Sequence, residues 1–192
     1  MLVRVQGRFQ PILRFVDGER TCPWLFWLFS FFLSMSLENT HSLFSGSSRY
    51  DFEMNPNYTA GVEIIVINKN SFDKYGFGIN YQAKNNLIGV EGNYNFWPLY
   101  FFSQIKIAEI DRFKINAQFN LGYNFFNANA DYKDSVGSTK GGIYYSLGSV
   151  IYVGRSIQLR AFYSTNYGNL KIESNEFLVK NNFISLGLGY TF

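Results

Sequence analysis

The chain has 192 residues, of which 47% are hydrophobic and 20% aromatic, which is enough apolar material for one folded domain and excludes a disordered chain. Its 17 basic and 14 acidic residues are scattered singly and give a net charge of +3, so no basic stripe suited to nucleic acid is present. A single cysteine, Cys22, excludes a disulfide framework and a metal site built from cysteines.

The aromatic content separates two classes of folded protein. Mean hydropathy is only −0.08, yet the chain carries 21 Phe and 14 Tyr. In a membrane β-barrel, lipid-facing and lumen-facing residues alternate, so each segment averages to near neutral and gives no transmembrane-helix signal. The composition therefore favours a membrane barrel over an ordinary soluble core.

Residues 1–42 are predicted to be a signal-peptide-like leader. Four arginines precede the apolar run 24–37, WLFWLFSFFLSMSL. The run is shorter than the ~20 residues that a membrane-spanning helix needs, so we interpret it as the helix of an export signal. A membrane-anchoring helix retained in the mature protein is the competing interpretation. Cys22 precedes the run instead of following it, which argues against lipidation.

From residue 43 onward the chain alternates with the period of β-strands. The clearest segment is 113–125, in which apolar Phe, Ile, Ala, Leu and Tyr residues alternate with Lys, Asn, Gln and Gly. A tilted membrane strand needs about 9 to 11 residues, whereas a strand of a soluble sandwich has about 5 or 6. Several segments here have the length of a membrane strand. The predicted strands are 43–52, 58–67, 75–83, 96–108, 113–125, 142–153, 156–167 and 182–192. The weak segment 43–52 is included because bacterial single-chain barrels have an even number of strands.

The connections support this count. Short polar links are expected at 68–71, 109–112 and 154–155, and longer ones at 51–57, 84–95, 126–140 and 171–181. Outer membrane barrels alternate short periplasmic turns with longer external loops in this way. Pro98 has no amide hydrogen and is expected at the beginning of its strand.

The last segment carries the most specific pattern. Small residues alternate with Ile184, Leu186, Leu188, Tyr190 and Phe192. This resembles the C-terminal signature of bacterial outer membrane barrels, in which a final Phe and alternate hydrophobic residues are read by the barrel assembly machinery.

With the strand spacing over 43–192, the chain resembles the small eight-stranded outer membrane β-barrel family that includes OmpA-like and OmpX-like domains. The resemblance implies an all-β, up-and-down, antiparallel transmembrane barrel of eight strands, a monomer among the lipids of the bacterial outer membrane. It also implies that Leu186, Leu188, Tyr190 and Phe192 form the assembly signal. The competing class is a soluble β-sandwich or lipocalin-like barrel, which strand length and aromatic load disfavour.

The sequence offers little for catalysis. His41 is the one histidine, and it falls at the end of the predicted leader with no assignable nucleophile or acid partner. The glycine-rich stretch 137–142, GSTKGG, lacks a phosphate-binding pattern and is interpreted as a flexible loop. We therefore expect no enzyme activity, metal or cofactor, and a lipid-modifying enzyme is the least favoured hypothesis.

Six charged residues are predicted to point into the lumen and to pair there, because an unpaired buried charge is costly: Arg49, Asp51, Glu63, Lys106, Lys114 and Arg160. A barrel of about eight strands is filled by its own side chains, so this network should plug it. The favoured function is then structural or adhesion-like, with an extracellular or host ligand bound at the loops 84–95, 126–140 and 171–181. The alternative is a narrow porin-like channel or carrier for small solutes, should the network open.

Overall fold

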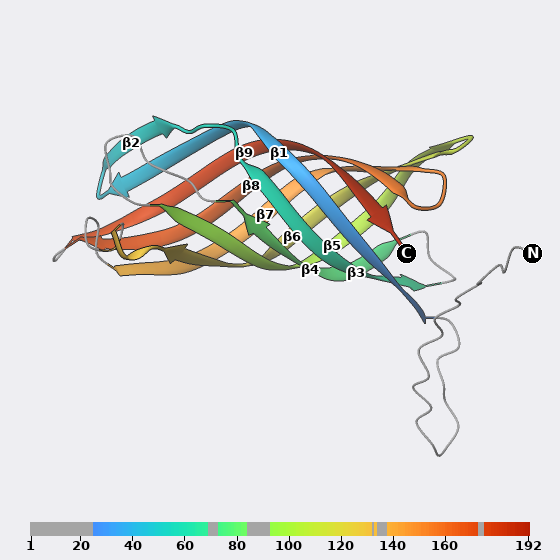
Figure 1. Ribbon diagram of the computed structural model, residues 1–192, viewed down its shortest axis with the longest axis horizontal. Coiled ribbons are helices and arrows are strands. Elements are labelled where there is room, and N and C mark those ends of the chain that lie inside the picture. Colours follow the sequence, from blue (N-terminus) through green and yellow to red (C-terminus); the bar gives the residue numbers. More distant parts are fainter. Residues whose placement is uncertain (1–24, 69–72, 84–92, 132, 134–137, 173–174) are drawn as a thin grey trace, which may run out of the picture.

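The computed structural model describes residues 25–68, 73–83, 93–131, 133, 138–172 and 175–192, which form one antiparallel sheet closed into a barrel (Figure 1). In chain order the strands are β1 (Leu25–Ser45), β2 (Ser48–Glu53), β3 (Tyr58–Asn68), β4 (Lys74–Gln82), β5 (Tyr94–Ile110), β6 (Phe113–Ala128), β7 (Ser138–Val153), β8 (Ile157–Ile172) and β9 (Asn175–Thr191). Each strand from β3 to β9 pairs with the next, and β9 pairs with β1 to close the sheet.

The nine strands occupy eight positions around the barrel. β1 pairs with β3 between Leu25 and Met35, and with β2 between Thr40 and Ser45. β2 and β3 therefore lie one after the other along the same edge of β1 and count as one wall position. This agrees with the predicted all-β, eight-stranded, up-and-down architecture.

The two ends of the barrel differ. The tight links after β5 and β7 lie at the end where β9 finishes, which we call the turn end. The β1–β2 hairpin, with Gly46 at φ +56°, lies at the opposite end, which we call the loop end (Figure 1).

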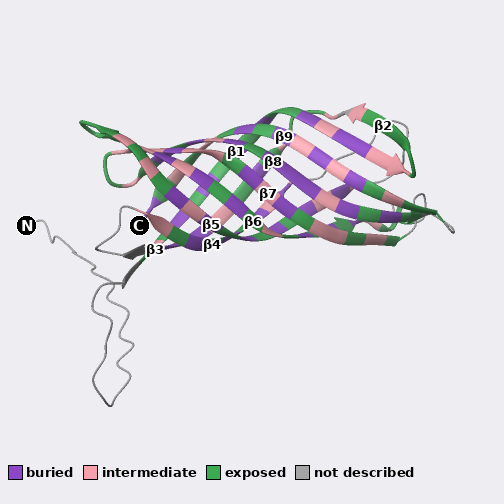
Figure 2. Ribbon diagram, turned by 180° about the vertical axis from the view of Figure 1, so that it is seen from behind, coloured by how far each residue is buried: buried purple, intermediate pink, exposed green. Residues whose placement is uncertain are grey.

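The wall is apolar outside and polar inside, as Figure 2 shows by the alternation of exposed and buried residues along every long strand. On β6, Phe119, Leu121 and Tyr123 are about half exposed, whereas Gln118 and Asn120 are buried. A soluble barrel would show the reverse arrangement, since water would meet its outer face. The lipocalin-like interpretation is therefore wrong.

The predicted leader is wrong for residues 25–42. They form most of β1, hydrogen-bonded to β3 on one side and β9 on the other. Trp27, Phe29 and Leu33 point outward with exposed side chains, while Ser30 and Ser34 are buried inside. Residues 1–24, including Cys22, lie outside the described residues. Among those described, no helix is long and apolar enough to cross a membrane.

The predicted first strand at 43–52 is also wrong. The chain turns at Gly46 and Ser47, so residues 43–45 end β1 and residues 48–52 belong to β2. The faces are reversed as well: Phe52 packs toward the lumen, and Arg49 and Asp51 are exposed. The exposed apolar side chains of β1 end at Leu37. Beyond Leu37 the outside of the wall meets water, so the Phe52 ring points inward.

The predicted connection 171–181 is shorter than expected, because strands continue through it. β8 and β9 extend across most of the predicted loop 171–181, since Leu170 and Val179 are buried inside the barrel at these strand ends. Pro98 lies within β5 instead of at its start. It is tolerated there because the pairing of β4 with β5 stops at Leu99, the residue next to it. Most of the predicted loop 84–95 lies outside the described residues.

Candidate functional site: the polar lumen

An ion pair occupies the middle of the lumen. Glu63 on β3 and Arg160 on β8 meet from opposite walls, with Arg160 Nη1 donating to Glu63 Oε2 at 2.7 Å and Nη2 to Oε1 at 2.6 Å. The two side chains are 0% and 3% exposed. Such a two-pronged, fully desolvated pair has both the geometry and the hydrogen bonds that a buried charge requires.

Neutral polar groups complete the coordination of Glu63. Gln118 Nε2 donates to Glu63 Oε1 at 3.0 Å, and the Tyr100 hydroxyl lies at the same distance. On the other partner, the Arg160 guanidinium lies 4.0 Å from the centre of the Phe32 ring. Both charges are therefore held by several strands at once.

The network continues around the wall through amides and hydroxyls. Gln118 also donates to Asn120 at 2.7 Å, and Asn120 donates to Ser146 at 2.6 Å. Toward the turn end, Gln104 donates to Gln118 at 2.7 Å and accepts from Tyr152 at 3.0 Å. A fully connected polar network of this kind rigidifies the interior.

Large aromatic rings fill the remaining space by lying over glycines of neighbouring strands. A Cβ atom at Gly78 would overlap the ring of Tyr100, and one at Gly61 would overlap the ring of Phe32. Gly76 and Phe102 form another such pair. Inward glycines thus make room for aromatic side chains instead of leaving an open pore.

An aromatic cluster closes the loop end of the lumen. Its buried members are Tyr94, Phe96, Phe126, Ala128, Leu170 and Val179. Within it Tyr94 and His41 are joined by a hydrogen bond of 2.8 Å between the hydroxyl and Nδ1. His41, expected in a leader, is thus fully buried on β1.

Comparisons of the sequence with known proteins find no relative. No family model matches the sequence. No curated protein is similar to it in sequence.

Solved structures do match. Neisserial surface protein A is 13% identical with a TM-score of 0.52, over 85% of this chain and 97% of that chain. The outer membrane protein OprG of Pseudomonas aeruginosa is 12% identical with a TM-score of 0.50, over 88% and 96%. The outer membrane protein AlkL, determined in lipid bilayers, is 14% identical with a TM-score of 0.53, over 92% and 94%. The chain has the fold of a small outer membrane β-barrel.

Of the six charged residues predicted for the lumen, Glu63 and Arg160 lie there together. Arg49 and Asp51 form an exposed pair on β2, with 2.8 Å between Nε and Oδ1. Lys106 and Lys114 both bind Glu109 near the turn end, at 2.9 and 3.3 Å. All three residues of that group are at least partly exposed, so their charges remain hydrated.

The C-terminal residues line the outside of the seam between β9 and β1. Leu186, Leu188, Tyr190 and Phe192 all point outward and are 48% to 68% exposed. Phe192 N donates to the carbonyl of Phe29 at 2.9 Å, and its ring packs edge-on against Phe31. The last strand thus closes the barrel against the first.

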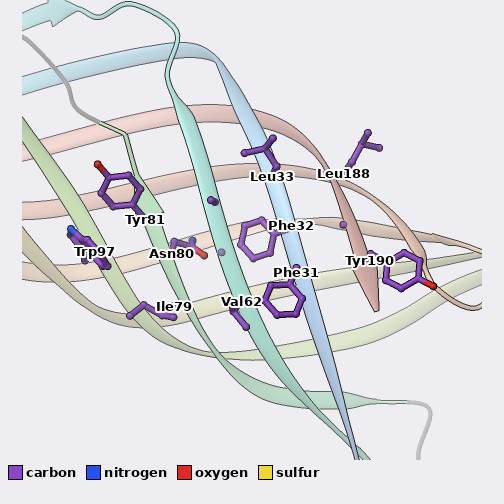
Figure 3. A pocket seen from close by; sticks show the side chains of 13 residues that line it. Phe31, Phe32, Leu33, Val62, Ile79, Asn80, Tyr81, Trp97, Leu188 and Tyr190 are labelled. Carbon is purple, nitrogen blue, oxygen red and sulfur yellow. The ribbon is translucent and has the colours of Figure 1, made fainter. Parts of the chain in front are cut away.

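A hollow of about 650 Å³ lies on the outer wall near this seam (Figure 3). It crosses β9, β1, β3, β4 and β5, and apolar side chains such as Phe31, Leu33 and Trp97 line it. These residues belong to the exposed apolar belt. The hollow therefore opens on the lipid-facing surface, and its floor includes the inward side chains of Phe32 and Asn80.

Proposed function

We propose that the protein is a closed outer membrane barrel that acts through the surface at its loop end, in a structural or adhesion-like role. The observation that carries this proposal is the doubly hydrogen-bonded Glu63–Arg160 pair, which spans the lumen at its middle. Aromatic rings occupy the interior on both sides of it, Tyr152 toward the turn end and Phe126 toward the loop end. A lumen filled in this way supports anchoring and does not favour passage.

The length of the strands supports the same role. On β1 the outward residues are apolar from Trp27 to Leu37, close to the roughly 10 residues that cross a bilayer as a tilted strand. Beyond Leu37 the strand continues to Ser45 with Glu38 and Thr40 outside. The barrel wall therefore projects past the membrane at the loop end, which we assign to the cell exterior, and presents a rigid rim to a ligand.

Two measurements test the proposal. Purified protein in planar bilayers should give no reproducible unitary currents, and protease added to intact cells should cleave only at the loop end. Salt-dependent unitary currents from the pure protein would refute the closed lumen. Protection of the loop end in intact cells would refute the surface role.

The second candidate is a narrow channel or carrier for small solutes. It is favoured by the neutral polar lining of the lumen, which contains many more amides than the ion pair uses. Passage would require the Glu63–Arg160 pair to separate. A current that appears only in Glu63→Gln protein would identify this pair as the barrier.

A further inference from the structure

A second polar region lies between the ion pair and the aromatic cluster. On adjacent strands β1, β9 and β8, His41 is paired in register with Asn181, and Asn181 with Asn166. From the opposite wall, Gln82 on β4 accepts a hydrogen bond of 3.0 Å from Asn166 Nδ2. All four side chains are at most 2% exposed, so they form a buried belt across the lumen.

Each member of this belt keeps one polar atom that no other described residue pairs with: Gln82 Nε2, Asn166 Oδ1, Asn181 Oδ1 and His41 Nε2. Buried polar groups in folded proteins are almost always hydrogen-bonded, either to protein or to bound water. Such atoms therefore indicate a partner from outside the protein, and two of the four belong to residues that border one cavity, Gln82 and Asn181.

A cavity beside the belt provides the space. The cavity has a volume of about 10 Å³ and is bordered by Gln82 and Asn181 and, on the outer side, by Ser36 and Asn57. Here the wall is the link between β2 and β3, not a strand. Asn57 N donates to Ser36 Oγ at 2.7 Å and Asn57 Nδ2 to the carbonyl of Ala83 at 2.8 Å, which fixes the link in place.

We propose that this cavity is a binding site for a single water molecule, held by Gln82 as donor and Asn181 as acceptor. The two unpaired atoms, one a donor and one an acceptor, require a partner that both donates and accepts, which water does. An ion would lie in the cavity without a countercharge, because Glu63 and Arg160 already satisfy each other. A single water needs a cavity of about 10–15 Å³, so this cavity holds one water and excludes a larger solute.

The test is nuclear magnetic resonance on the isotope-labelled full chain folded in micelles. The Gln82 side-chain amide should show direct cross-relaxation with water. Gln118 is the matched control, because it is equally buried and both its amide hydrogens are donated, to Glu63 and Asn120. Equal absence of the water signal at Gln82 and Gln118 would overturn the proposal.

A substitution then tests the role of Asn181. Asn181→Leu keeps the volume but removes the acceptor, so the water signal at Gln82 should fall while the Gln118 signal stays unchanged. If that variant does not fold, Asn181→Ser enlarges the cavity and should keep or strengthen the signal. An unchanged Gln82 signal in Asn181→Leu, or a lost signal in Asn181→Ser, would show that the site is not built as proposed.

Discussion

Replacing Glu63 by Gln should be among the most destabilising single changes in the lumen. The substitution keeps the size of the side chain but leaves the Arg160 charge buried at 3% exposure without its carboxylate. The carboxylate accepts two hydrogen bonds from Arg160, of 2.6 and 2.7 Å, whereas the amide can accept only one and carries no charge. Removing one partner of a buried pair costs about 3–5 kcal/mol. The Phe32 ring beneath the guanidinium does not replace a negative charge, so we expect a loss in that range.

Urea unfolding in lipid vesicles, followed by tryptophan fluorescence, measures this loss. The double variant Glu63→Gln/Arg160→Met removes both charges and should be less destabilised than the sum of the two single variants. Asp51→Asn, which breaks the exposed pair with Arg49, is the control and should leave the unfolding midpoint nearly unchanged. A loss below about 1 kcal/mol in Glu63→Gln, or single effects that add within about 0.5 kcal/mol, would refute the reasoning.

Three further changes test other parts of the barrel by the same unfolding assay. Gly78→Ala places a methyl group against the Tyr100 ring and should cost about 1–3 kcal/mol through overpacking; wild-type stability would show that the ring moves aside freely. Leu121→Arg puts a charge on the lipid face and should cost about 2–4 kcal/mol, whereas no loss would place Leu121 outside the membrane. Tyr94→Phe removes the hydroxyl bonded to His41 Nδ1 and should cost about 1–3 kcal/mol; a neutral effect would mean that the bond contributes nothing.

The architecture could be predicted because it depends on local alternation. Along 113–125 every outward residue is apolar and every inward residue is polar or small, and this pattern requires no knowledge of any other strand. The even strand number could be predicted for a similar reason, since it follows from closure. The total of eight is correct although the first strand is wrong, because the segment 43–52 replaces β1 in the predicted count.

The lumen could be predicted only in part. Glu63 and Arg160 were recognised as inward charges from their places in alternating segments. Their partners Tyr100 and Gln118 were not singled out, because neutral amides and tyrosines give no charge signal and their contacts join distant strands. On β7, Tyr144 and Tyr152 share the face of Ser146 and Gly148, so the alternation of apolar and polar residues is less regular there. Both tyrosines are buried in the lumen, at 2% and 4% exposure.

The misread N-terminal strand follows from the same non-local packing. In residues 25–37 the inward face carries an aromatic residue, Phe32, as well as the outward face. The alternation of apolar and polar residues is therefore lost, and the run resembles the helix of a signal peptide. Phe32 can point inward only because Gly61, on β3, has no side chain in its way and the Arg160 guanidinium lies over its ring. Neither residue is near it in sequence. The inward position of an aromatic residue on a barrel strand can therefore be predicted only when the glycine opposite it in the neighbouring strand is known. Here the register of β1 with β3 pairs Phe32 with Gly61.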